Sequence, residues 1–126
     1  MPGSNRRTKQ RDALISVLER AERPLSVAEL LEAASKRIDR LGVATVYRAI
    51  SALLAEGRIE AVEIPGEPVR YERADKAHHH HFQCERCERV FDIAGCMESL
   101  RNLVPPTFRV SRHAVTLFGT CEACMG

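Results

Sequence analysis

Two Cys-x-x-Cys pairs constrain the fold of this chain more than any other feature. Cys84 and Cys87 form the first pair and Cys121 and Cys124 form the second, with 33 residues between the pairs. Four thiolates on two such turns can hold one tetrahedral Zn²⁺. The alternative is a pair of surface redox dithiols. We expect a structural zinc. Its apparent binding energy of roughly 10–16 kcal/mol would contribute to folding and would fix the C-terminus onto the start of its own domain.

A run of four histidines, His78–His81, lies just before the first cysteine pair. It is internal, unlike a purification tag. If the run is a β-strand, alternate side chains point to opposite faces, so one run can serve two metal sites. The candidate ligand sets are Glu72, His79, His81 and Asp92 on one face, and His78, His80, Glu98 and His113 on the other. Imidazole and carboxylate ligands suit Zn²⁺, Fe²⁺, Mn²⁺ and Ni²⁺ alike. The alternative is a solvated polar stretch.

Three residues near these sets have competing interpretations. His113 would share a strand face with Val115 and Leu117, which is also typical of a hydrogen-bonded core histidine. Glu98 lies at an expected helix start, where it could simply favour the helix dipole. Cys96 is the fifth cysteine, and we expect it to be a small buried apolar residue rather than a metal or redox group.

The first half of the chain has the periodicity of three short helices. Apolar residues recur at helical spacing in segments 8–21, 26–37 and 42–57. Ser26 and Glu29 have the spacing of a capping box, so a helix should begin at Val27. Gly57 should cap the third helix. The outward face of that helix carries Thr45, Tyr47, Arg48 and Ser51. This pattern predicts a helix-turn-helix.

A period-2 pattern follows in segment 58–73, interrupted by Pro and Gly at 65–68, and it predicts a hairpin "wing". The second half should contain strands near His81–Cys84 and Val90–Ile93, a short helix near Met97–Val104 and a strand over Phe108–Phe118. We therefore expect an α+β chain with a winged helix-turn-helix domain at 1–73, a hinge at 74–77 and a small α/β domain at 78–126.

Charge is distributed unevenly along the chain. Residues 1–58 carry 11 Lys and Arg against 7 Asp and Glu, whereas residues 59–126 carry 8 against 10. An anionic partner should therefore meet the first half. Basic residues Arg6, Arg7, Lys9 and Arg11 could contact DNA phosphates, although a solvated tail is the alternative. No apolar run is long enough to span a membrane and no secretory signal is visible, so we expect a cytoplasmic protein.

Three stretches together are similar to the ferric uptake regulator (Fur) family of bacterial metal-dependent repressors. They are Leu41–Ile50 (LGVATVYRAI), His78–Cys87 (HHHHFQCERC) and Gly119–Cys124 (GTCEAC). The resemblance implies a winged helix followed by a dimerisation domain, and a homodimer that binds an AT-rich palindromic operator when loaded with metal. It implies that residues at the positions of Tyr47 and Arg48 contact the DNA.

The resemblance also implies structural zinc on the four cysteines. It implies a regulatory metal on residues at the positions of Glu72, His79, His81 and, less firmly, Asp92. A further site is implied on His78, His80 and His113 with a carboxylate near Glu98. Departures concern the histidine that many members contribute near the second helix, which is missing, and Glu88, where glycine is common. A zinc uptake regulator often has a cysteine in the hinge site, and none precedes Cys84.

The sequence therefore predicts a non-enzymatic, metal-responsive repressor of metal-uptake genes, with zinc favoured as the sensed metal, then iron, and Mn²⁺ or Ni²⁺ still open. An alternative within the same family is an iron-dependent peroxide sensor in which a ligating histidine is oxidised. An alternative of another class is a zinc-ribbon interaction module with no DNA role, which leaves the helical half unexplained. Hydrolase and deaminase motifs such as His-Glu-x-x-His are absent.

Overall fold

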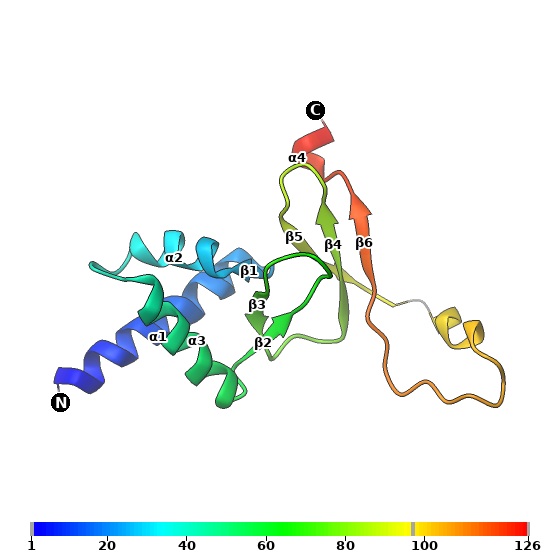
Figure 1. Cartoon of the computed structure of the whole chain (residues 1–126), viewed down its shortest axis with the longest axis horizontal. Coiled ribbons are helices and arrows are strands. Elements are labelled where there is room, and N and C mark those ends of the chain that lie inside the picture. Colours follow the sequence, from blue (N-terminus) through cyan, green and yellow to red (C-terminus); the bar gives the residue numbers. More distant parts are fainter. Residues whose placement is uncertain (1, 97, 126) are drawn as a thin grey trace. The chain divides into compact units, whose positions relative to one another are not determined.

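The computed structural model describes residues 2–96 and 98–125, and the side chains of these residues except 2–5 and 98. The chain divides into two compact units, Met1–Lys76 and Ala77–Gly126. The division falls within the segment 74–77. Each unit has a three-stranded sheet (Figure 1), and the sheets differ in the order and direction of their strands.

Three helices form most of the first unit: α1 (Pro2–Ala21), α2 (Val27–Ser35) and α3 (Val43–Ala55). Their apolar stripes meet in one core, in which Leu14, Leu30 and Leu53 are at most 1% exposed. Burial of each such side chain stabilises the folded state by about 1.5–3 kcal/mol relative to leaving it exposed to water. The helical periodicity read from the sequence is therefore confirmed, and it decides which faces pack together.

The start of α2 has the predicted capping box. The Ser26 hydroxyl accepts a hydrogen bond from the Glu29 backbone N–H at 3.2 Å, and the Glu29 carboxylate accepts one from the Ser26 N–H at 3.1 Å. Arg23 also donates to Glu29, at 3.0 Å. Burial raises the pKa of Glu29, but these hydrogen bonds outweigh it, so the net pKa is lowered. The cap fixes the turn that separates α1 from α2.

A small antiparallel sheet completes the first unit. Strands β1 (Leu25–Ser26), β3 (Arg70–Arg73) and β2 (Ile59–Val62) are arranged in that order, and β2 and β3 form the predicted hairpin. Gly57 ends α3 at φ +70° and Gly66 turns the hairpin at φ +79°, a backbone region that other residues rarely adopt. The fold of this unit is that of a winged helix-turn-helix.

The second unit is built on a sheet of order β5-β4-β6. Strand β4 (His79–Cys84) pairs antiparallel with β5 (Val90–Ala94) and parallel with β6 (Thr116–Gly119). The short 3₁₀ helix η1 (Glu98–Leu103) and the turn of helix α4 (Glu122–Met125) complete it. The expected helix near Met97–Val104 is thus a 3₁₀ helix, and Met97 itself lies outside the described residues. No helix among those described combines the length and apolarity that crossing a bilayer requires.

The predicted strand over Phe108–Phe118 is wrong for most of its length. Only Thr116–Gly119 is a strand, and residues 108–115 run as an irregular segment that returns to the sheet (Figure 1). The reason is register. Thr116 pairs with His81, so continuing backward places His113 opposite His78, one residue before β4 begins. Residues before this point have no strand among the described residues of the unit to pair with. The proposed strand face shared by His113, Val115 and Leu117 is therefore also wrong.

Candidate metal centres and nucleic-acid interface

Four cysteines converge at one end of the second sheet. Cys84 ends β4 and Cys87 lies in the turn before β5. Cys121 directly precedes α4, and Cys124 lies within α4. Their sulfurs lie within 4.8 Å of one another, and the Cys87 and Cys121 sulfurs are 3.8 Å apart. Such a closed set of four thiols has the donor type and the proximity that a structural Zn²⁺ site requires. The residues present therefore fit this metal.

Backbone geometry prepares Cys84 to be a thiolate. The N–H groups of Cys87 and Cys121 each donate to its sulfur at 3.4 Å. These two hydrogen bonds lower the pKa of Cys84 to about 6. Hydrogen bonds to the neighbouring sulfurs, that of Cys121 first, together with burial raise the pKa of Cys124 to about 12, because they favour its protonated thiol. A divalent metal would displace that proton and hold all four thiols deprotonated.

Glu88, in the turn between the first cysteine pair and β5, has a left-handed backbone at φ +65°. Its N–H donates to the Cys84 carbonyl at 2.9 Å. Non-glycine residues rarely adopt this region. The turn that presents Cys87 is therefore strained in this chain, which gives a physical reason why glycine suits the position.

The histidine run lies on β4 from His79 on, and its side chains alternate between the two faces as expected. On one face the rings of His79 and His81 are 4.8 Å apart. Their Nε2 atoms lie 3.5 and 3.6 Å from Oδ1 of Asp92, which is the β5 partner of His81. His79 Nδ1 is 2.8 Å from the Ala77 carbonyl, so Nδ1 carries the ring proton and Nε2 keeps its lone pair for a metal.

The other expected member of this set, Glu72, belongs to the first unit. It lies on β3, where its carboxylate accepts a hydrogen bond from Lys76 Nζ at 3.3 Å. Its place beside the histidines stays a prediction. Within the second unit alone, His79, His81 and Asp92 supply two nitrogens and one carboxylate, a set that suits Zn²⁺ and also Fe²⁺ and Mn²⁺.

On the opposite face of β4 three of the predicted residues come together with one that was not predicted. His78, His80 and His113 come together with Cys96, and their donor atoms lie within 4.8 Å of one another. Glu98 begins η1, and its side chain lies outside the part of the chain that the structure describes. Cys96 is exposed rather than a small buried apolar residue. The sequence analysis did not assign Cys96 to a metal site. The signal that could have indicated one is that Cys96 is the cysteine outside the two Cys-x-x-Cys pairs.

The exposed face of α3 carries the residues predicted to meet DNA. The Tyr47 side chain is 53% exposed, and Arg48 and Ser51 are exposed beside it. Arg48 donates to the Thr45 hydroxyl at 3.1 Å, which orients its guanidinium along the helix. Gly42, the residue before α3, provides no side-chain cap, so the first N–H groups of the helix are not satisfied by a capping side chain. Such a helix end attracts phosphate.

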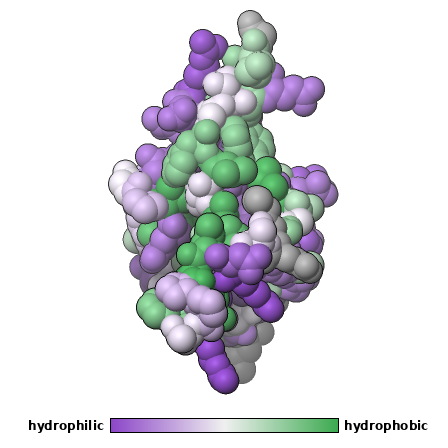
Figure 2. Space-filling view, turned by 90° about the vertical axis from the view of Figure 1, so that its right-hand side faces the viewer, coloured by the Kyte–Doolittle hydropathy of each residue, from purple (hydrophilic) through white to green (hydrophobic). Residues whose placement is uncertain are grey.

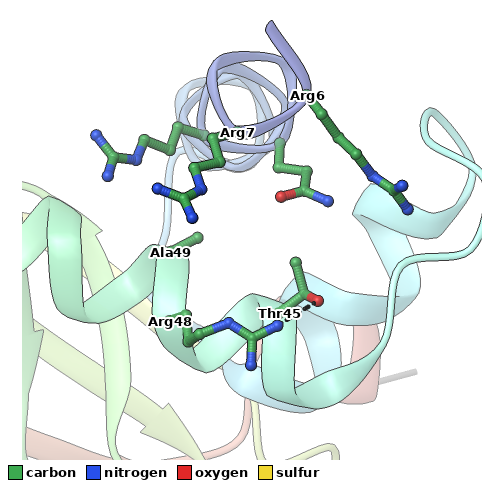
Figure 3. Close-up of a pocket in the computed structure, with 7 residues that line it drawn as sticks. Arg6, Arg7, Thr45, Arg48 and Ala49 are labelled. Carbon is green, nitrogen blue, oxygen red and sulfur yellow. Dashed lines mark hydrogen bonds between the residues drawn. The ribbon is translucent and has the colours of Figure 1, made fainter. Parts of the chain in front are cut away.

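A cavity of about 600 Å³ lies between α1 and α3 and is strongly cationic. Figure 3 shows Arg6 and Arg7 extending from α1 above the part of α3 that carries Thr45 and Arg48. Arg11 also lines it and forms an ion pair with Glu56 at 2.8 Å. Four guanidinium groups around one opening can bind an anion. Because guanidinium matches phosphate geometry, the lining favours a nucleic-acid backbone.

The second unit exposes several large apolar side chains. Leu103, Phe108, Leu117 and Phe118 are each more than half exposed. The space-filling view in Figure 2 shows hydrophobic surface gathered in the middle of the visible face. Exposed apolar area of this kind is typical of a surface that another chain covers.

Comparison with known proteins gives one consistent result. The ferric uptake regulator family matches residues 3–118. The ferric uptake regulation protein of Helicobacter pylori is 29% identical over 120 residues, which are 93% of this chain and 80% of that protein. The zinc uptake regulation protein of Mycobacterium tuberculosis is 30% identical over 123 residues, 94% of each chain.

A solved structure agrees with these matches. The structure of the Helicobacter pylori ferric uptake regulator superimposes with a TM-score of 0.74 at 27% identity, covering 94% of this chain and 81% of that one. That protein has three functional metal-binding sites. The likeness confirms the α+β architecture of a DNA-binding unit followed by a second α/β unit.

Proposed function

Since the chain belongs to the ferric uptake regulator family, we propose that it is a metal-responsive repressor of metal-uptake genes, active as a metal-loaded homodimer on an AT-rich palindromic operator. Members of this family are DNA-binding transcription regulators and not enzymes, and so is this chain. The operator, the sensed metal and the target genes are the parts that we propose.

The arrangement of His79, His81 and Asp92 carries the proposal. The two Nε2 atoms face one carboxylate oxygen at 3.5 and 3.6 Å, and the Ala77 carbonyl sets the tautomer of His79. Two imidazoles and a carboxylate bind a divalent metal reversibly, as a sensor requires, whereas four thiolates bind zinc tightly. Glu72 is proposed as a further ligand on the sequence match alone.

The cationic face of the first unit supports the DNA part. Tyr47 and Arg48 are proposed to contact the operator, with Thr45, Ser51 and Arg11 beside them. Arg6 and Arg7, which line the same cavity as Arg48, would add phosphate contacts that raise affinity without reading sequence. A homodimer would place two α3 helices one DNA turn, or a multiple of it, apart. The exposed apolar side chains of the second unit are proposed as part of the dimer contact.

Metal binding is proposed to act by shifting populations. A dimer whose winged helices move freely about residues 74–77 binds a palindrome poorly, and a metal at the regulatory site would favour the one arrangement that fits. Changing that arrangement from 1% to 99% populated requires about 5.5 kcal/mol of differential metal affinity. We propose Zn²⁺ as the sensed metal and Fe²⁺ as the second candidate, because curated relatives of both kinds match the chain at similar identity.

The test is an operator-binding titration with Zn²⁺, Fe²⁺, Mn²⁺ and Ni²⁺, with bound metal measured at each point. Protein that retains its cysteine-bound zinc but no labile metal should bind operator at least about tenfold more weakly than loaded protein. His81→Ala should abolish the metal response, and Arg48→Ala should abolish binding while leaving zinc content unchanged. Equal binding with and without the labile metal would refute metal control. Full binding by Arg48→Ala would favour an interaction module without a DNA role.

A further inference from the structure

The second histidine face of β4 contains a donor that the proposed function does not use. Cys96 Sγ lies 2.8 Å from His113 Nε2 and 3.4 Å from His80 Nε2. His78 Nε2 lies 3.2 Å from the same His113 nitrogen. Every one of these atoms belongs to the second unit. Three imidazoles and one thiol therefore surround a common point.

These distances match the edges of a metal tetrahedron. Bonds of about 2.0–2.1 Å to nitrogen and about 2.3 Å to sulfur place neighbouring ligand atoms roughly 3.3–3.6 Å apart. The His78–His113 and His80–Cys96 separations lie close to this range. Only the Cys96–His113 contact, at 2.8 Å, is shorter than this range, and these two atoms would move apart around a metal.

Of the four donors, only His80 lies in a strand, β4. The Val115 N–H donates to its Nδ1 at 3.2 Å. This contact fixes the ring so that Nε2 faces Cys96. Because Nδ1 accepts, Nε2 carries the ring proton in the metal-free form. Metal binding at Nε2 would release that proton to solvent while Nδ1 takes one from solvent, so the contact with Val115 would be given up when His80 becomes a ligand.

We infer that Cys96 is a metal ligand and that this cluster is a His₃Cys site for a borderline-soft divalent ion, of which Zn²⁺ is the expected example. The Cys96 thiol proton is released to solvent when the metal binds. Thiolate selects Zn²⁺ over Mn²⁺, which prefers oxygen donors. The inference deepens the proposed function, since it assigns a metal class to the second site, and it distinguishes this face of β4 from the His79–His81–Asp92 face, which has no sulfur.

Cobalt gives a direct test, because Co²⁺ bound to a thiolate has a near-ultraviolet charge-transfer band that Co²⁺ bound to nitrogen and oxygen lacks. The full-length protein is first loaded with zinc at its four paired cysteines, and zinc content is measured throughout. Co²⁺ is then added. The expected result is a charge-transfer band that is lost in Cys96→Ser and kept in the control His79→Ala, which alters the opposite face.

Alkylation supplies a second, independent measurement. Cys96 is the one cysteine outside the two pairs, and it is exposed, so it should react with iodoacetamide in zinc-loaded protein. Added Zn²⁺ should slow this reaction by about tenfold or more, because the free thiolate is the nucleophile and a thiolate bound to a metal no longer attacks freely. Added Mn²⁺ should not slow it. His113→Ala should remove the protection and leave the paired cysteines zinc-bound.

Two results would overturn the inference. One is a cobalt spectrum without a thiolate band while zinc stays on the paired cysteines. The other is an alkylation rate of Cys96 that saturating Zn²⁺ does not change. Neither result involves DNA, so the proposed repressor function would stand. Conversely, a thiolate band in a protein that fails to bind any operator would support this site and count against the repressor.

Discussion

The two units of the chain are stabilised by different means. The first unit buries a continuous apolar core from three helices, with Leu14, Leu30 and Leu53 at most 1% exposed. In the second unit, Cys84 and Val90 are the buried apolar residues among those that the structure describes, and Phe108, Leu117 and Phe118 are exposed. A unit of some 50 residues with so small a core needs a metal or a partner chain. Apolar burial therefore stabilises the first unit, and we propose that metal ligation stabilises the second.

Removal of the cysteine-bound zinc should have the largest effect. Cys87→Ser, or a strong chelator, should unfold the second unit, because structural zinc contributes roughly 10–16 kcal/mol of apparent binding energy. Hydrogen exchange should become fast throughout 77–126 and remain slow in α1 and α3. Ser111→Ala, a change at an exposed position away from the sulfurs, is the matched control. Equal loss of hydrogen-exchange protection in both units would contradict the claim that the two units are stabilised by different means.

The reciprocal change is Leu30→Ala in α2. Leu30 is fully buried, and such a truncation should cost about 2–5 kcal/mol, through lost burial and the cavity left behind. Exchange should accelerate in residues 2–76, while the bound zinc per chain stays at its original value. Leu54→Ala, at a residue that is 38% exposed, should change stability far less. Loss of zinc from the Leu30 variant would mean that the units fold together.

The capping box offers a smaller test of the first unit. Ser26→Ala removes the hydroxyl that accepts from the Glu29 N–H, and it should cost about 0.5–2 kcal/mol. Urea unfolding followed by the helical signal measures this. Ser26→Asp is the control, since Asp also caps helices and should restore most of the loss. Zinc affinity should be the same in all three proteins.

Relief of the Glu88 backbone tests the second unit on a similar scale. Glu88→Gly should stabilise the turn by up to about 1 kcal/mol, since left-handed strain of roughly 1–2 kcal/mol is partly offset by the larger entropy of glycine in the unfolded chain. The measurement is zinc retention against a graded chelator series. Glu85→Gly, in the same turn region without a positive φ, should not improve retention.

Acid should act weakly on the first unit through Glu29. The pKa of Glu29 is lowered on folding by its contacts with Ser26 and Arg23, so its charged form stabilises the folded state above the ordinary carboxyl pKa. That stability is lost as pH falls through the lowered pKa. Glu29→Gln should therefore reduce the acid sensitivity of the first unit between about pH 5 and 3. Unchanged acid unfolding of the variant would mean that other carboxylates dominate.

Much of the first unit could be predicted from local sequence. Its helices follow apolar periodicity, the Ser26–Glu29 cap sets the start of α2, and Gly57 ends α3, because each depends on residues within one or two turns of the same helix. The second unit could be predicted less well. The strand expected over Phe108–Phe118 failed because its length depends on where β4 begins, and that is a property of pairing between distant segments.

The sequence by itself determined the donor types and their alternation. Two Cys-x-x-Cys pairs specify a tetrathiolate set, and a histidine run on a strand must divide between two faces, since both follow from local backbone geometry. Only the tertiary structure decided which distant donors join each face. Cys96 comes to lie 2.8 Å from His113, and neither residue is in a strand or helix, so no periodicity in the sequence could place them together. That meeting depends on how the irregular segment after η1 returns to the sheet.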